Sequence, residues 1–196
     1  MTDCYTRTRS RRTLTLSNTA ESITVTYSGT ATELVHDIAA HLYKLPRFCG
    51  AVAENYSVLH HSVACGLLAK QEGISRDGCS QALLHDAHEM LTGDIPSPVK
   101  LFMGDGIKNI EAGFDGALSK LFSPRLWENT ARIKKIDSHV CVAEMAVFGI
   151  SNGNNIAPSR EYIEMVEYVL GIPTEYMLSK MFFHGLAYAG LWSWVD

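Results

Sequence analysis

The sequence predicts a mostly α-helical protein with a small β-ribbon at its N-terminus. From about residue 32 onward, apolar residues recur at the spacing of one buried helix face. Runs of β-favouring residues lie within the first 27 positions. The chain has 196 residues, of which 46% are hydrophobic, enough for one domain with a sizeable core. We expect an arm and ribbon at 1–31 and a helical core at 32–196.

The first 31 residues predict an arm followed by two strands. A run of four arginines is typical of a solvated arm, or of a contact with a partner subunit or an anion. These arginines are Arg7, Arg9, Arg11 and Arg12. Residues 13–16 and 23–27 favour strands, and Ser17-Asn18 favours a turn between them. The two strands would form a ribbon that ends at Ser28-Gly29.

The rest of the chain predicts a series of helices separated by breakers. The first helix has an apolar residue at every fourth position and stops at Pro46. Ser57 and Ser75 are suitable N-cap residues for the second and third helices. The helices are expected at about 32–45, 58–71, 76–91, 107–122, 124–148, 161–170 and 175–194, with an extended segment at 95–98 and a loop at 151–155.

The charge and the cysteines exclude several classes of protein. A net charge of −4 gives no basic field for duplex nucleic acid. The sequence has no apolar run of about 18 residues and no apolar segment near its start, so we expect neither a membrane span nor a secretory signal. The 5 cysteines include no CxxC pair, which disfavours a disulfide framework or a zinc knuckle. We expect a cytoplasmic protein with reduced thiols.

Two histidines and two aspartates are candidate ligands of a single metal ion: His61, His85, Asp86 and Asp137. An ionised Asp137 among the apolar residues of its helix is costly unless it is paired, and a divalent cation would offset that cost. Two imidazoles and two carboxylates suit Mn²⁺, Fe²⁺, Co²⁺ or Zn²⁺ better than Mg²⁺ or Ca²⁺. Taken singly, each residue is more often a hydrogen-bonded structural residue than a ligand. His60 and His88 are expected on a helix surface or at the core rim.

The order of these four residues resembles the H…HD…D pattern of the HD-domain phosphohydrolases. The block from His85 to Lys100, HDAHEMLTGDIPSPVK, is similar to the same block of bacterial 5′-deoxynucleotidases. Upstream, the Arg47-Phe48 pair precedes a helix that begins YSVLHHS, as in that branch. Phage-type dATP triphosphohydrolases share the layout. The resemblance covers roughly residues 33–148 and implies an HD-domain helical bundle.

The resemblance implies a metal centre with its own catalytic groups. It implies that one divalent transition metal, Co, Mn, Zn or Fe, binds to His61, His85, Asp86 and Asp137. Glu89 would orient or deprotonate the attacking water, a role that needs a carboxylate within one water of the metal. Asp94 would lie near the sugar or assist the leaving oxygen.

The resemblance also implies substrate-binding residues. Arg47 would hold a phosphate, because its planar guanidinium suits that contact. Phe48 would pack on the sugar or the base, and it stands where the deoxynucleotidases carry tryptophan. Lys100 and Lys134 would either meet further phosphates or lie on the surface as ordinary lysines.

The implied activity is hydrolysis of the 5′ phosphoester of a deoxynucleotide in a bacterial or phage-infected cytoplasm. The form of the Arg47-Phe48 segment and the two lysines favour a dATP triphosphohydrolase, which releases deoxynucleoside and triphosphate. A 5′-deoxynucleotidase that acts on monophosphates is the alternative. A cyclic-nucleotide or alarmone hydrolase and a non-catalytic nucleotide-binding module are further alternatives. We expect a homo-oligomer, with the aromatic residues at 182–194 in the core or at an interface.

Overall fold

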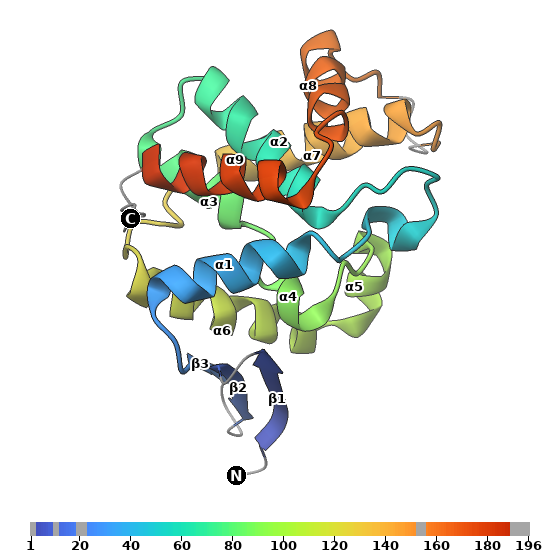
Figure 1. The fold of residues 1–196 in the computed structure, drawn as a ribbon. Coiled ribbons are helices and arrows are strands. Elements are labelled where there is room, and N and C mark those ends of the chain that lie inside the picture. The colour runs from blue at the N-terminus through green and yellow to red at the C-terminus, as the bar shows by residue number, and fades with distance from the viewer. Residues whose placement is uncertain (1–2, 10–11, 19–22, 152–155, 189–196) are drawn as a thin grey trace.

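The computed structural model describes residues 3–9, 12–18, 23–151 and 156–188, and the protein is mostly helical (Figure 1). Three antiparallel strands come first: β1 (Asp3–Arg9), β2 (Arg12–Asn18) and β3 (Ile23–Tyr27). β2 and β3 correspond to the expected ribbon, but Ser17 and Asn18, expected as its turn, belong to β2 and pair with Thr24 and Ile23. β1 pairs with β2 on the other side, so residues expected as an arm supply a third strand.

The sheet packs on the helical core through its last strand. β3 contacts α6 (Asp105–Leu121) and buries Val25, so the sheet lies at one end of the molecule, below α1 (Ala31–Leu42) and α6 in Figure 1. Thr30 caps α1 by accepting the backbone N–H of Glu33 at its Oγ1.

The central helix is α2 (Val58–Gln71), which contacts α3 (Arg76–Leu84), α7 (Thr130–Val147), α8 (Arg160–Leu170) and α9 (Glu175–Tyr188). Of its 14 residues, 11 are buried, so α2 is enclosed on nearly all sides rather than on one face. This placement puts His61 in the protein core.

The packing of α2, α3 and α9 depends on two glycines. Leu83 of α3 lies between Gly66 of α2 and Gly185 of α9. A Cβ added at either glycine would lie 2.5 Å from a methyl carbon of Leu83. A side chain at either position therefore requires Leu83 or the surrounding helices to shift.

The third predicted helix is interrupted, which corrects the expectation that His85 and Asp86 lie mid-helix. α3 ends at Leu84, and α4 (Glu89–Thr92) begins after a four-residue turn. The Nδ1–H of His85 donates to the carbonyl oxygen of Ala82 at 2.8 Å, taking the acceptor that the N–H of Asp86 would use in a continuous helix. The turn continues with i→i+3 bonds, such as Ala87 N–H to Leu84 O at 2.9 Å.

Other boundaries differ where prolines and turns occur. Ser97 and Pro98, expected to be extended, begin the unpredicted helix α5 (Ser97–Met103), because a proline in the first helical turn loses no hydrogen bond. α7 begins at Thr130 rather than at 124. Part of the expected loop at 151–155 and the last helix beyond 188 lie outside the described residues. No helix in the described ranges is both long enough and apolar enough to cross a membrane.

Candidate metal centre

Four side chains from three elements converge on one point: His61 of α2, His85 and Asp86 of the turn after α3, and Asp137 of α7. The Nε2 of His61 lies 3.3 Å from the Nε2 of His85. The same atom is 3.6 Å from the Oδ2 of Asp86 and 3.2 Å from the Oδ1 of Asp137. The Nε2 of His85 is 3.2 Å and 3.9 Å from these two oxygens.

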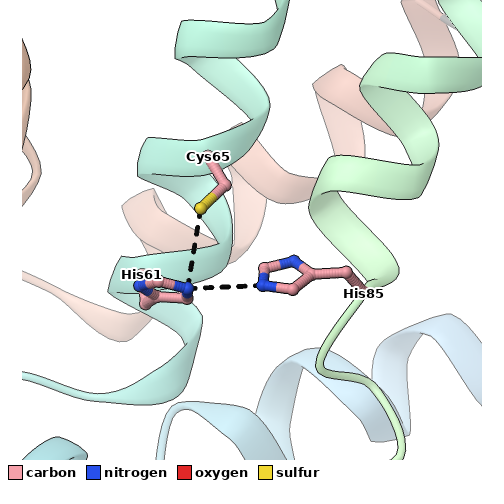
Figure 2. A group of neighbouring side chains, drawn as sticks. All are labelled: His61, Cys65 and His85. Carbon is pink, nitrogen blue, oxygen red and sulfur yellow. Dashed lines mark hydrogen bonds between the residues drawn. The ribbon is translucent and has the colours of Figure 1, made fainter. Parts of the chain in front are cut away.

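The second ring nitrogen of each histidine already has an acceptor. The Nδ1 of His61 lies 2.6 Å from the Oε1 of Glu144, and the Nδ1 of His85 lies 2.8 Å from the Ala82 carbonyl. A carboxylate and a carbonyl only accept, so Nδ1 carries the proton in both rings. In the neutral rings both Nε2 atoms then present lone pairs, and they face each other (Figure 2). Both also lie close to the carboxylates of Asp86 and Asp137. Such a group of acceptors needs a proton or a cation between its members.

The spacing of the donors fits a single metal ion. Two donors that are each about 2.1 Å from a tetrahedral ion lie about 3.4 Å apart. The five distances given above run from 3.2 to 3.9 Å. Without a cation, the cluster retains a proton: burial would lower the pKa of His85, but the adjacent Asp86 carboxylate raises it to about 10. The described structure contains two groups of side chains that could hold a metal ion: His61 with Cys65 and His85, and Asp86 with His88 and Glu89. The four converging side chains share His61 and His85 with the first group and Asp86 with the second.

Glu144 completes this arrangement, and the sequence analysis did not identify it. Its side chain is fully buried and accepts hydrogen bonds from the Nδ1 of His61, the hydroxyl of Tyr56 at 3.0 Å and the Nη2 of Arg47 at 2.9 Å. Burial alone would raise the pKa of Glu144, but the charges of His61 and Arg47 lower it to about 2. The sequence signal that could have identified Glu144 is its position two helical turns after Asp137, which places both residues on the same helix face.

A cavity of about 400 Å³ opens beside the four converging side chains. Its lining includes Asp86 and Asp137, and it brings in five further predicted residues: Arg47, Phe48, Glu89, Asp94 and Lys100. Lys134 is exposed on α7 and is not among the described lining residues. The predicted site residues His61, His85 and Lys134 are not among the described lining residues, and the other seven are.

Arg47 is held rigidly at the cavity wall. Its Nη2 pairs with Glu144, its Nη1 lies 3.4 Å from the Oδ1 of Asp94, and its guanidinium carbon lies 5.4 Å from the centre of the Phe48 ring. The Nε of Arg47 has no hydrogen-bond partner among the described groups. Phe48 and Cys49 have φ of 54° and 55°, a left-handed conformation that non-glycine residues rarely adopt outside functional sites.

Glu89 also lines the cavity and has an oxygen without a hydrogen-bond partner among the described groups, its buried Oε2. Burial, together with the charges of Asp86 and Asp94, raises the pKa of Glu89 to about 9. The Nζ of Lys100 lies 3.7 Å from Glu89 and 2.9 Å from Glu111, so Lys100 reaches the cavity already paired with carboxylates.

The two remaining histidines of these segments are buried rather than on the surface. His60 accepts the backbone N–H of Ser57 at its Nδ1, 3.1 Å away, and so caps the start of α2. His88 lies between Glu111 and Asp115, with its ring nitrogens 3.5 and 3.6 Å from their oxygens. Neither nitrogen of His88 forms a hydrogen bond with a described residue.

No known protein-family model matches this sequence. The chain is similar to YfdR, an uncharacterized protein of Escherichia coli (strain K12), with 31% identity over 121 residues. The matched segment covers 62% of this chain and 64% of YfdR, so the chain spans just under two thirds of that protein's length.

Proposed function

We propose that the protein is a metal-dependent phosphohydrolase of the HD-domain type that cleaves the 5′ phosphoester of deoxynucleotides. The observation that carries the proposal is the convergence of four acceptor side chains, His61, His85, Asp86 and Asp137, beside a cavity. The resemblance of the His85–Lys100 block to deoxynucleotidases supports the substrate class.

The residues present fit one divalent transition metal: Co, Mn, Zn or Fe. Mixed imidazole and carboxylate donors are suited to these ions, and the orientation of both rings is fixed by hydrogen bonds at Nδ1. When bound, such an ion would polarise a phosphoryl oxygen and lower the pKa of water beside it.

Arg47 would bind the phosphate. Its guanidinium is held in place by Glu144 and Asp94, and its Nε has no other partner among the described groups. A planar guanidinium held in this way offers a directed donor to a phosphate oxygen without losing much side-chain entropy. Phe48, half-buried beside it, would pack against the sugar or base.

Glu89 would accept the proton of the attacking water. Its unpaired Oε2 is available for that contact, and a carboxyl with a raised pKa is a stronger base than an ordinary one. The charge of Asp86 contributes to the raised pKa, so neutralising that charge would bring the pKa of Glu89 down toward neutral pH. Asp94, which also contacts Arg47, would lie near the sugar and the leaving oxygen.

We propose dATP as the substrate, with deoxynucleoside and triphosphate as the products. A 5′-deoxynucleotidase is the second candidate, and one observation favours it. Lys100 is paired with Glu111 and Glu89, and Lys134 is not among the described residues that line the cavity. The cavity therefore offers fewer unpaired cations for the second and third phosphates than the sequence suggested.

The test separates the products of dATP and dAMP by anion exchange after incubation with Mn²⁺ or Co²⁺. Release of intact tripolyphosphate from dATP is the expected result. Release of phosphate from dAMP with no turnover of dATP would replace the first candidate by the second. Failure to dephosphorylate any member of a full panel of deoxynucleotides would contradict both.

A further inference from the structure

We propose that Cys65 supplies a fifth protein donor to this metal centre, through its sulfur, and that it makes the centre select thiophilic ions. The inference rests on the proposed function only in requiring that the centre bind a cation. It adds a ligand type that the H…HD…D pattern does not contain.

The position of Cys65 places its sulfur among the imidazole donors. Cys65 follows His61 by one turn of α2, so both side chains lie on the same helix face. Its Sγ is 3.6 Å from the Nε2 of His61, and the donor atoms of His61, Cys65 and His85 all lie within 4.8 Å of one another (Figure 2). A sulfur at about 2.3 Å and a nitrogen at about 2.1 Å from one ion lie about 3.1 Å apart at an angle of about 90° and about 3.8 Å apart at about 120°, and the observed separation falls within that range.

The hydrogen bonding of the two histidines points independently to a cation at this position. Because Glu144 and the Ala82 carbonyl fix the proton of each ring on Nδ1, both Nε2 atoms act as acceptors toward the cluster. The thiol of Cys65 could donate its one hydrogen to His61, but a His85 ring protonated on Nδ1 alone would still face the Asp86 carboxylate with no hydrogen on Nε2, and only a second proton or a cation supplies that contact. A cation contacted by the sulfur would also meet the Nε2 atoms of both histidines, which lie within 4.8 Å of that sulfur.

Binding through sulfur requires the thiol to lose its proton. The thiol and the hydrated ion would give a metal–thiolate bond, with the proton released to solvent and no change of oxidation state. Thiolate ligands favour Zn²⁺ and Co²⁺ over Mn²⁺ and Mg²⁺. Cys65 is fully buried, so its sulfur would be shielded from bulk solvent once bound.

Cys141 provides a matched control within the same protein. It follows Asp137 by four residues on α7, the same spacing that relates Cys65 to His61. Cys141 is partly exposed and lines the cavity, but it does not belong to the described donor group of His61, Cys65 and His85.

The experiment loads metal-free wild type, Cys65→Ser and Cys141→Ser with Co²⁺ and records near-ultraviolet absorption. We expect a sulfur-to-cobalt charge-transfer band in the wild type and in Cys141→Ser, and none in Cys65→Ser. In competition titrations, Cys65→Ser should lower the affinity for Zn²⁺ relative to that for Mn²⁺ by at least about tenfold.

Each outcome supports or overturns the inference. A band that persists in Cys65→Ser, or that disappears in Cys141→Ser alone, overturns it. Wild type that binds Co²⁺ and hydrolyses deoxynucleotides without the band overturns the thiolate ligand and leaves the proposed function standing. Wild type that binds no Co²⁺ overturns both. If Cys65→Ser does not fold, as judged by circular dichroism, the wild-type and Cys141→Ser spectra still decide.

Discussion

His85 and His88 lie three residues apart in one turn and near carboxylates, yet their surroundings differ: His88 is buried and His85 is half-buried. One nitrogen of His85 is fixed by the Ala82 carbonyl, and the other faces a tight cluster that includes His61 and Asp86. Both nitrogens of His88 face carboxylates at 3.5 and 3.6 Å without forming a hydrogen bond. A ring fixed at one nitrogen is oriented to bind at the other, whereas the ring of His88 has neither tautomer nor orientation fixed.

The carboxylates of the two regions also differ in whether a lysine pairs with them. Around His85, Asp86 and Asp137 face imidazole nitrogens, and no lysine ammonium lies within 4.0 Å of either carboxylate in the described structure. Around His88, Glu111 pairs with the ammonium of Lys100 at 2.9 Å. The negative charge of Asp86 and Asp137 is therefore available to a divalent ion, whereas Glu111 near His88 is already paired with Lys100. The comparison predicts that metal binding depends on the first region alone.

We expect the largest effect on metal binding, and only for one of the two histidines. His85→Ala removes a ligand, so we expect loss of the metal and a fall in deoxynucleotide turnover of more than about 100-fold, since even indirect support of a ligand is worth about 10–100-fold. His88→Ala, its matched control, should retain the metal. Elemental analysis of both purified variants checks the prediction, and equal metal loss in both would remove the distinction between the regions.

Glu89 tests whether the chemistry can be separated from metal binding. Glu89→Gln keeps the shape of the side chain but cannot accept a proton, so turnover should fall by about 10²–10⁴-fold while the metal stays bound. Single-turnover kinetics and metal content, measured on the same sample, provide the readout. Full activity in this variant would show that another group takes the proton.

Glu144→Gln tests whether the hydrogen bond between Glu144 and the Nδ1 of His61 strengthens metal binding. Glu144→Gln removes the charge that holds Nδ1 of His61 and pairs with Arg47, so metal affinity should weaken by about 10–100-fold. Glu111→Gln, in the His88 region, is the comparison and should leave metal affinity unchanged. Titration calorimetry with Zn²⁺ on both variants measures the difference, and a larger loss for Glu111→Gln would contradict the assignment.

The last prediction is a pH dependence of stability in the metal-free protein. The pKa of Glu89 is about 9 in the folded protein against an ordinary value of 4.5, so the folded state binds the proton more tightly than the unfolded state. Its contribution to the free energy of unfolding should therefore fall as pH rises from about 5 to 9. Urea unfolding of wild type and Glu89→Gln across that range should show a shallower decline in the variant, and parallel curves would reject the raised pKa.

Short-range sequence patterns correctly predicted helix α2 and the residues that converge at the candidate metal centre. α2 begins and ends at the predicted residues, because Ser57 and Gly73 mark its ends within the sequence itself. The four proposed ligands were identified by residue type and order, and they lie within reach of one another in the structure.

The missed features depend on contacts that periodicity does not encode. The helix break after Leu84 comes from a side chain that competes for a backbone acceptor. The role of Glu144 requires α7 to pack on α2, across a separation of 83 residues from His61. α5 carries strongly exposed apolar residues, including Leu101 and Phe102, so it lacks the pattern of a half-buried helix.

The packing of Leu83 against Gly66 and Gly185 connects the far side of α3 to the proposed metal centre. Leu83 is two residues before His85, so displacement of α3 by a bulkier residue at Gly66 or Gly185 would carry His85 and Asp86 with it. Alanine at either glycine should therefore disturb the spacing of the ligands without touching the cavity. Surveys of inactive variants would then find hits at Gly66 and Gly185, which are not among the residues that line the cavity of the proposed metal centre.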